Sequence, residues 1–249
     1  HRVHRRQRQM CIRDRNSITI DPSNIERAEI IFGSSSVGYG SDAMGGVIHY
    51  YTKNPILKNS EKISSSFTTN FNSANNSVSN NFNTSLSSDN WGSITSISIS
   101  KYGDIKMGKN RNHGFSEWGL NPIYSKNSRY SYYSEPSTNS DNNIQRNTGY
   151  SQVDLFQKFL VNLGDSSLLN LNIQFSESSD IDRFDQLSIP KDNSLKYSEW
   201  YYGPQKRLLI SPSLRVFPNK KFMDKGVITF GFQKINESRI KRKFNSLNR

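Results

Sequence analysis

Large apolar residues alternate with small polar residues along much of the chain after residue 60. The clearest case is residues 169–176, where leucine, isoleucine and phenylalanine occupy the odd positions and asparagine, glutamine and serine the even ones. This period of two is typical of a strand with one apolar and one polar face. The pattern predicts seven strands, near residues 61–73, 76–88, 91–103, 149–163, 167–180, 205–217 and 226–238.

The predicted strands are unusually long, each more than twice the usual globular strand of about 5–6 residues. Their connections differ in size. Most are short, but those near 104–148 and 181–204 are long. If successive strands run in opposite directions, both long connections lie at the same end. Transmembrane barrels have this asymmetry, with short periplasmic turns and long extracellular loops.

A large soluble β-sandwich or solenoid also alternates and is the other interpretation of this pattern. Two features favour the barrel. The polar positions hold small uncharged side chains, as suits a barrel lumen, and aromatic residues lie near strand ends, where membrane girdles occur: Trp91, Tyr102, Tyr150 and Phe217. We therefore predict an all-β membrane fold.

Composition changes this picture little. The chain has 249 residues, of which 33% are hydrophobic, and a net charge of +12. It contains no run of 18 apolar residues, which excludes a transmembrane helix. Residues 1–15 hold six arginines, one aspartate and Cys11, the sole cysteine, and match nothing that follows. We interpret them as a non-native leader; the alternative is a basic arm that binds nucleic acid.

Residues 30–53 crowd glycines between two short apolar strands, with a helical turn predicted to start at Ser41 or Asp42. Glycine permits positive φ and a close approach of backbone to backbone. A phosphate-binding loop does not fit, because no Gly-Lys-Ser or Gly-Lys-Thr follows.

At these residues the chain resembles the C-terminal half of the plug domain of TonB-dependent outer-membrane receptors. The resemblance rests on sixteen positions: Ile25, Glu26, Arg27, Glu29, Gly33, Ser36, Tyr39, Gly40, Ser41, Ala43, Gly45, Gly46, Val47, Ile48, Thr52 and Lys53. Two positions depart from the pattern. Phe32 stands where many members have arginine, and Ser34 where they usually have proline.

The resemblance implies that residues 16–54 are the C-terminal part of a plug and residues 55–249 the first strands of a 22-stranded barrel. The chain would then be a fragment of a monomeric outer-membrane receptor that binds TonB through a segment missing here. The segments "TGYSQVDLFQKF", "SSDIDRFDQL", "YSEWYYGPQK" and "NESRIKRKFN" further resemble haem or haemoglobin-type receptors of Bacteroidetes-like bacteria.

The resemblance also names candidate site residues in the plug: Glu26, Arg27, Glu29, Gly33, Tyr39, Gly40, Ser41, Gly45 and Gly46. We expect the three charged residues among them to form ion pairs with lumen-facing charges of the barrel. The alternative is a solvated strand face. The basic end of the chain, from residue 238 onward, is expected near the outer rim of the seventh strand, where lipopolysaccharide phosphates or water would meet it.

The long loops carry the candidate ligand contacts: His113, Tyr124, Tyr130, Trp200 and Tyr201. Tyrosine and tryptophan supply rigid contact area with a polar tip. Girdling at the membrane interface explains Trp200 and Tyr201 equally well, while for Tyr124 and Tyr130 the loop position favours ligand binding or loop packing over girdling. His113 and His49 are the only histidines outside the leader, so neither a catalytic triad nor a multi-histidine metal site is predicted.

The leading hypothesis is therefore an active transporter, not an enzyme, with no cofactor of its own, that imports haem or another iron complex. Its partners would be TonB, outer-membrane lipid and the extracellular ligand, without nucleic acid. The alternatives are a cobalamin or oligosaccharide importer of the same build, and a surface adhesin without transport. The adhesin predicts that residues 30–53 form an ordinary hairpin within a larger sheet.

Overall fold

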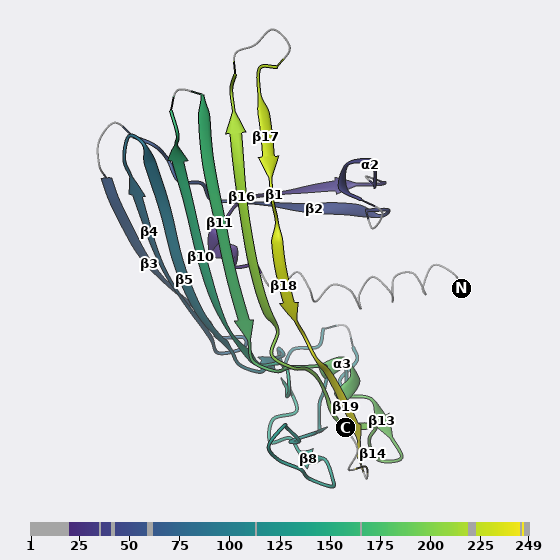
Figure 1. Cartoon of the computed structure of the whole chain (residues 1–249). Coiled ribbons are helices and arrows are strands. Elements are labelled where there is room, and N and C mark those ends of the chain that lie inside the picture. The colour runs from purple at the N-terminus through teal and green to yellow at the C-terminus, as the bar shows by residue number, and fades with distance from the viewer. Residues whose placement is uncertain are drawn as a thin grey trace.

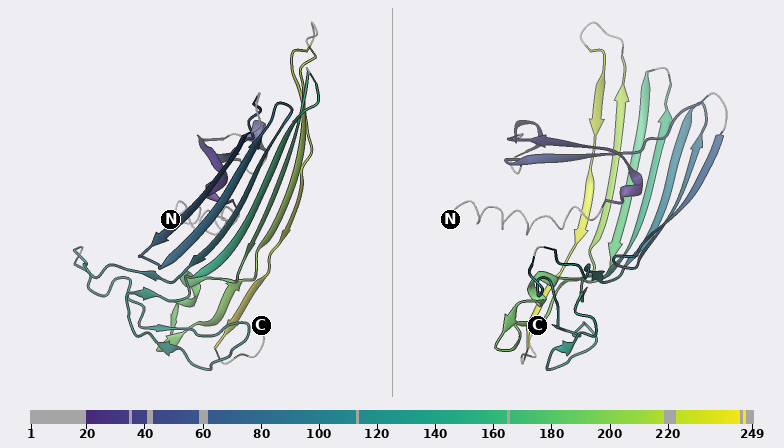
Figure 2. Two further views of the ribbon diagram at one scale, coloured as in Figure 1. Left: turned by 90° about the vertical axis from the view of Figure 1, so that its left-hand side faces the viewer. Right: turned by 180° about the vertical axis from the view of Figure 1, so that it is seen from behind.

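Eight strands form one curved antiparallel sheet, which we call the wall (Figures 1 and 2). The computed structural model describes residues 20–34, 36–40, 43–58, 62–112, 114–164, 166–218, 223–244 and 246. The wall has the order β17-β16-β11-β10-β5-β4-β3, with β18 also paired to β16. Its strands are β3 (Lys62–Asn72), β4 (Ser77–Ser87), β5 (Trp91–Tyr102), β10 (Tyr150–Asn162), β11 (Ser167–Ser178), β16 (Lys206–Val216), β17 (Gly226–Thr229) and β18 (Phe232–Asn236).

All seven predicted strands are present, but the seventh is broken into β17 and β18. The break faces Pro212 of β16, which has no N–H to donate across the ladder. The Phe230 N–H still donates to the Pro212 carbonyl at 3.0 Å, and the Ser211 hydroxyl donates to the Phe230 carbonyl at 3.1 Å. A side chain thus satisfies the carbonyl that the proline leaves without its ladder partner.

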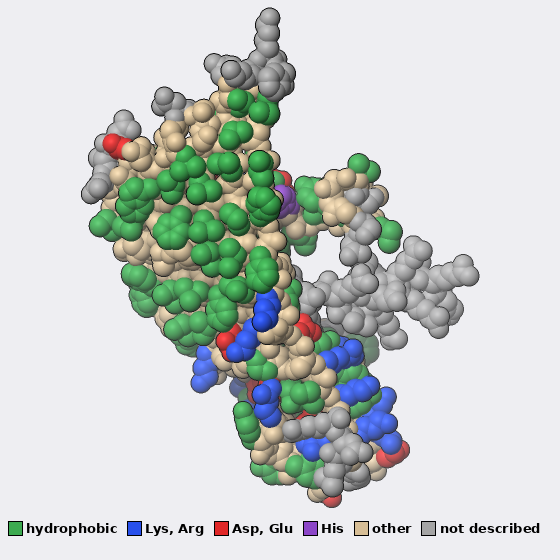
Figure 3. Space-filling view, in the orientation of Figure 1, with side chains coloured by type: hydrophobic (Ala, Val, Ile, Leu, Met, Phe, Trp, Pro, Cys, Tyr) green, Lys and Arg blue, Asp and Glu red, His purple; other side chains and the backbone are tan. Residues whose placement is uncertain are grey.

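The convex face of the wall is apolar, as the alternation predicts. Residues in register across the strands form rows, for example Phe67, Phe82, Ile97, Leu155, Phe175 and Leu208. Figure 3 shows these apolar side chains as a broad green band. Polar side chains on this face bond laterally: Thr95 donates to Gln157 at 2.6 Å, and Thr69 to Asn80 at 2.9 Å. Such pairing is needed because lipid offers no partner.

The concave face carries a separate hairpin, which we call the plug hairpin (Figure 2). It consists of a 3-10 turn η2 (Pro22–Asn24), strand β1 (Ile25–Phe32), the helical turn α2 (Ser36–Tyr39) and strand β2 (Gly46–Thr52). β1 and β2 pair only with each other among the described strands. The helical turn lies ahead of Ser41 and Asp42, which fall outside the described residues.

The two long connections and the end of the chain form a second compact unit, the loop domain (residues 104–148, 181–204 and 239–243). Its central sheet joins β12 (Ile181–Asp182), β15 (Tyr197–Tyr202) and β19 (Arg239–Lys243). Its remaining elements are short: β6 (Ile105–Lys106), β7 (Ile123–Tyr124), β8 (Ser137–Thr138), β9 (Ile144–Gln145), α3 (Phe184–Leu187), β13 (Pro190–Lys191) and β14 (Ser194–Leu195).

The loop domain has a core of its own. Trp200, Tyr201 and Tyr202 are buried, and the Arg242 Nη2 lies 3.0 Å from the Glu199 Oε1 with both side chains almost fully covered. The basic end of the chain is therefore partly structural, because β19 completes this sheet. The described residues contain no helix that is both long and apolar enough to cross a membrane.

Candidate functional site

The first contact between the plug hairpin and the wall is made by Asp21, which is 9% exposed. Its carboxylate caps η2 by accepting from the Ser23 N–H at 2.9 Å and the Asn24 side chain at 2.8 Å. The same carboxylate accepts from the Ser98 hydroxyl of β5 at 2.6 Å. Ser98 in turn accepts from Asn81 at 2.7 Å. We call these residues the Asp21 contact.

The second contact is made by Lys158 of β10, which points from the wall toward the end of the plug hairpin. Its ammonium group donates to the Asn54 Oδ1 at 2.8 Å and the Thr52 hydroxyl at 2.9 Å. It also lies 3.2 Å from the Lys53 carbonyl. Lys158 is only 6% exposed, so these oxygens replace the water that a buried ammonium group requires. We call this set the Lys158 contact.

After Asn54, the chain runs over the surface of the wall as a linker, residues 55–58, which packs closely against the sheet. Pro55 is buried against Gly92 of β5, where an added Cβ would meet the Pro55 Cβ at 3.0 Å and the Ile56 carbonyl at 3.1 Å. An added side chain would therefore have to displace the linker by a few tenths of an ångström. Beyond it, the Lys58 N–H donates at 3.1 Å to the Ser88 carbonyl in the turn between β4 and β5.

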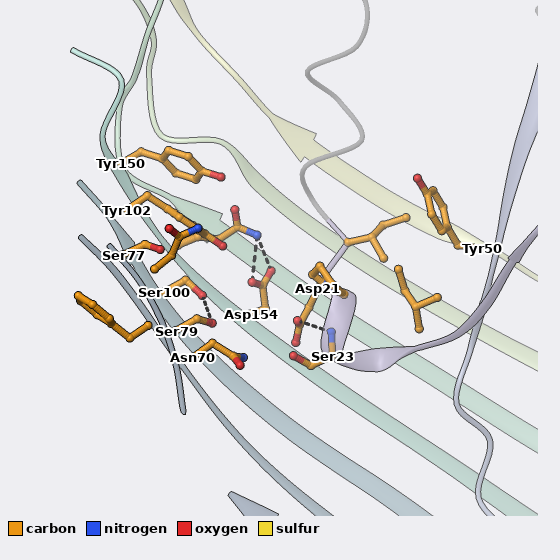
Figure 4. Close-up of a pocket in the computed structure, with 16 residues that line it drawn as sticks. Asp21, Ser23, Tyr50, Asn70, Ser77, Ser79, Ser100, Tyr102, Tyr150 and Asp154 are labelled. Carbon is orange, nitrogen blue, oxygen red and sulfur yellow. Dashed lines mark hydrogen bonds between the residues drawn. The ribbon is translucent and has the colours of Figure 1, made fainter. Parts of the chain in front are cut away.

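A cavity of about 700 Å³ separates the base of the plug hairpin from the loop end of the wall (Figure 4). Asp21 and Tyr50 line it from the hairpin side, and Asp154, Tyr102 and Tyr150 from the wall. The two wall tyrosines stack with centroids 4.6 Å apart. The girdle prediction is therefore wrong for Tyr102 and Tyr150, because their parity turns them toward the concave face.

The charged residues of the plug motif interact within the hairpin. The Arg27 Nε lies 3.0 Å from the Glu29 Oε1, and the Tyr51 hydroxyl donates to the other Glu29 oxygen at 3.0 Å. These two hydrogen bonds lower the pKa of Glu29, and the bond from Arg27 has the larger effect. Arg27 and Glu29 thus pair with each other within the hairpin, and the expected ion pairs with the barrel remain a prediction. Glu26 lies exposed on β1.

The other motif residues lie toward the hairpin tip. Gly33, Gly40 and Gly46 have positive φ, as the glycine-rich pattern indicates. The Tyr39 hydroxyl approaches the His49 ring at 3.5 Å, and this ring stacks on Tyr51. Gly45 follows the segment that contains Ser41, which lies outside the described residues.

The five predicted ligand contacts do not form one group. Trp200 and Tyr201 are 8% and 2% exposed in the loop domain, where they form its core. Tyr124 lies half-buried beside Arg146, while Tyr130 is 91% exposed. His113 lies outside the described residues. A role in ligand contact remains a prediction for all five.

Sequence reasoning missed Asp21, Ser98 and Lys158. Only Lys158 left a signal, since it and Asp154 are the charged residues on the inward-facing parity of their predicted strand. Asp21 precedes the plug motif, and Ser98 is one serine among many in β5. Their roles emerge only when the hairpin is placed against the wall.

The comparisons agree with this arrangement of plug and wall. Residues 8–47 match the family model of the TonB-dependent Receptor Plug Domain. The match begins inside the segment interpreted as a leader, and the leader boundary remains a prediction. None of the curated proteins matches the chain.

Two similar solved structures are those of ferric enterobactin receptors. One is a complex with BCV-L6, with a TM-score of 0.55 and 15% identity. The other is a mutant receptor from Pseudomonas aeruginosa in complex with enterobactin, with a TM-score of 0.54 and 17% identity. Each alignment covers 89% of this chain and 29% of the receptor.

At this identity the likeness shows the fold: an all-β membrane architecture with an incomplete barrel wall. The plug-domain match covers most of the hairpin on the concave face of that wall. Residues 8–47 therefore match a plug family, and the fold of the chain is similar to that of two ferric enterobactin receptors.

Proposed function

We propose that the receptor to which this chain contributes imports an iron complex across the outer membrane, driven by TonB. The observation that carries the proposal is the plug hairpin, which lies on the polar concave face and is bonded to the wall at its base. A hairpin attached at its base can be displaced without breaking the strand pairing of the wall.

The ligand class rests on two observations. The similar solved structures are ferric enterobactin receptors, and exposed basic residues cover the loop domain (Figure 3): Lys126, Lys191, Arg239, Lys241 and Lys243. This surface favours an anionic iron complex. Haem, with its two propionates, and a ferric catecholate chelate both belong to that class. The haem-type assignment still rests on the sequence resemblance.

The other roles follow from the same proposal. The apolar convex face contacts lipid, the loop domain lies outside the cell, and TonB acts from the periplasmic side. The complete barrel works as a monomer, without nucleic acid and without catalysis. The adhesin alternative is contradicted, because β1 and β2 form their own two-stranded sheet and residues 8–47 match a plug.

Uptake by cells tests the proposal. The complete receptor is expressed in an outer-membrane host that lacks iron receptors, and radiolabelled haem and a ferric catecholate chelate are supplied separately. We expect uptake of one of them, and its loss in a matched host without TonB. Equal uptake with and without TonB, or uptake of neither complex, would contradict the proposal.

A further inference from the structure

The two contacts between the plug hairpin and the wall lie on opposite sides of the hairpin in the sequence. The Asp21 contact lies just before β1, and the Lys158 contact just after β2. The two ends of the hairpin also bond to each other, since the Lys53 N–H donates to the Asn24 carbonyl at 3.0 Å. Both ends are therefore held at one place on the wall.

The two contacts differ in what they hold. Ser98 gives the Asp21 carboxylate one hydrogen bond from the wall, while Ser23 and Asn24 of the hairpin itself also donate to that carboxylate. Lys158 instead brings a buried charge to three consecutive residues of the chain, Thr52, Lys53 and Asn54. Beyond these residues, Pro55 of the linker packs against Gly92 of the wall.

We infer that Lys158 is the fixed clamp of the plug, and that the bond between Ser98 and Asp21 is its release point. The inference rests on the proposed function, in which force reaches the plug through the chain that precedes Asp21. Among the contacts between the hairpin and the wall, that force loads the Ser98 bond first. The β1–β2 ladder follows, and because its ends are adjacent, its bonds open one after another from the base. The Lys158 contact is loaded last.

Because the Lys158 contact is loaded last, it can protect the wall from the pulling force. If the end of β2 slipped along the wall, a pull on the plug would also strain the linker that leads into β3. Because Lys158 grips the residues ahead of that linker, the disturbance ends at residue 54 and the wall is spared. Lys158 is thus a positioning residue for transport.

Hydrogen exchange on the purified complete receptor tests both contacts without requiring transport. Ser98→Ala removes the donor to Asp21, and we expect amide exchange at residues 23–25 to rise about tenfold. Lys158→Met keeps the length of the side chain without its charge, and we expect roughly a 100-fold rise at residues 52–54. Lys101→Met, at an exposed lysine of β5, is the matched control and should change neither segment.

Single-molecule pulling from the N-terminal side distinguishes the roles. Ser98→Ala should lower the force at which the hairpin leaves the wall and should not change the final extension. Lys158→Met should not change that force and should lengthen the final extension by about 10–20 Å, the reach of a few more residues. Protection of β10 and β11 amides verifies folding in every variant.

The clamp is refuted if Lys158→Met exchanges and extends like Lys101→Met in a folded receptor. The release point is refuted if Ser98→Ala does not change the force at which the hairpin leaves the wall. Because both measurements use the purified receptor, they can fail while TonB-dependent uptake is confirmed, and they can succeed if the proposed ligand class is wrong.

Discussion

The plug hairpin and the loop domain are both attached to the wall, but they are held together in different ways. The hairpin exposes its ion pair, with 56% of the Arg27 side chain and 43% of the Glu29 side chain open to solvent. The loop domain buries its pair, with 0% of Glu199 and 6% of Arg242 exposed. The comparison indicates that, within this chain, the loop domain depends on a buried charge pair and the hairpin does not.

Removing the buried charge partner should have the largest effect. Glu199→Ala leaves Arg242 charged, covered and without its partner, so we expect the local stability of the loop domain to fall by about 3–5 kcal/mol. Hydrogen exchange of residues 197–202 and 239–243 in the complete receptor measures the loss. Lys191→Ala, which removes the exposed pair with Asp192, is the control and should cost less than about 1 kcal/mol. Equal effects would show that the loop domain does not depend on its buried pair.

A glycine of the plug motif should have an intermediate effect on the hairpin. Gly46 has a φ of +149°, and an added Cβ would lie 2.8 Å from the Ile31 carbonyl oxygen. We expect Gly46→Ala to destabilise the hairpin by about 1–3 kcal/mol, since this backbone region is nearly exclusive to glycine. Exchange of the β1 and β2 amides measures the change.

Gly38→Ala is the matched control, because Gly38 has no neighbouring atom within 4 Å of an added Cβ and no positive φ. It should leave the hairpin unchanged. If both variants behaved alike, the strained geometry at Gly46 would not be what stabilises the hairpin.

The smallest effect should depend on pH. Burial raises the pKa of Asp182 in the loop domain to about 6, although the Asn147 side chain donates to its carboxylate at 3.2 Å. The folded state therefore holds this proton more tightly than the unfolded state. As the pH rises from about 4 to about 6, the loop domain loses stability, and above pH 6 the loss is constant.

Asp182→Asn should remove that loss. We expect the variant to gain about 1–2 kcal/mol at pH 7 and nothing at pH 4, a figure reduced for the partial exposure of Asp182. Protease sensitivity of the loop domain across this pH range measures it, with Asp192→Asn, at an exposed side chain, as the control. A gain that is equal at both pH values would contradict the assignment to the Asp182 proton.

Sequence reasoning succeeded where structure follows from local alternation. Strands 61–73 and 167–180 were predicted within two residues of β3 and β11, because side chains of successive strand residues must point to opposite faces. The same parity rule also corrected the girdle prediction for Tyr102 and Tyr150. The break in the seventh strand was missed because its cause, Pro212, lies in the neighbouring strand.

By itself, the sequence determined the wall strands, their apolar and polar faces, the end that carries the long loops, and the plug motif. Only the tertiary structure decided that Arg27 pairs with Glu29, that β19 completes the loop domain, and that Lys158 grips Thr52. The reason is physical. Alternation is set by neighbouring residues, whereas Lys158 and Thr52 are 106 residues apart and meet only because the curvature of the wall and the path of the linker bring them together.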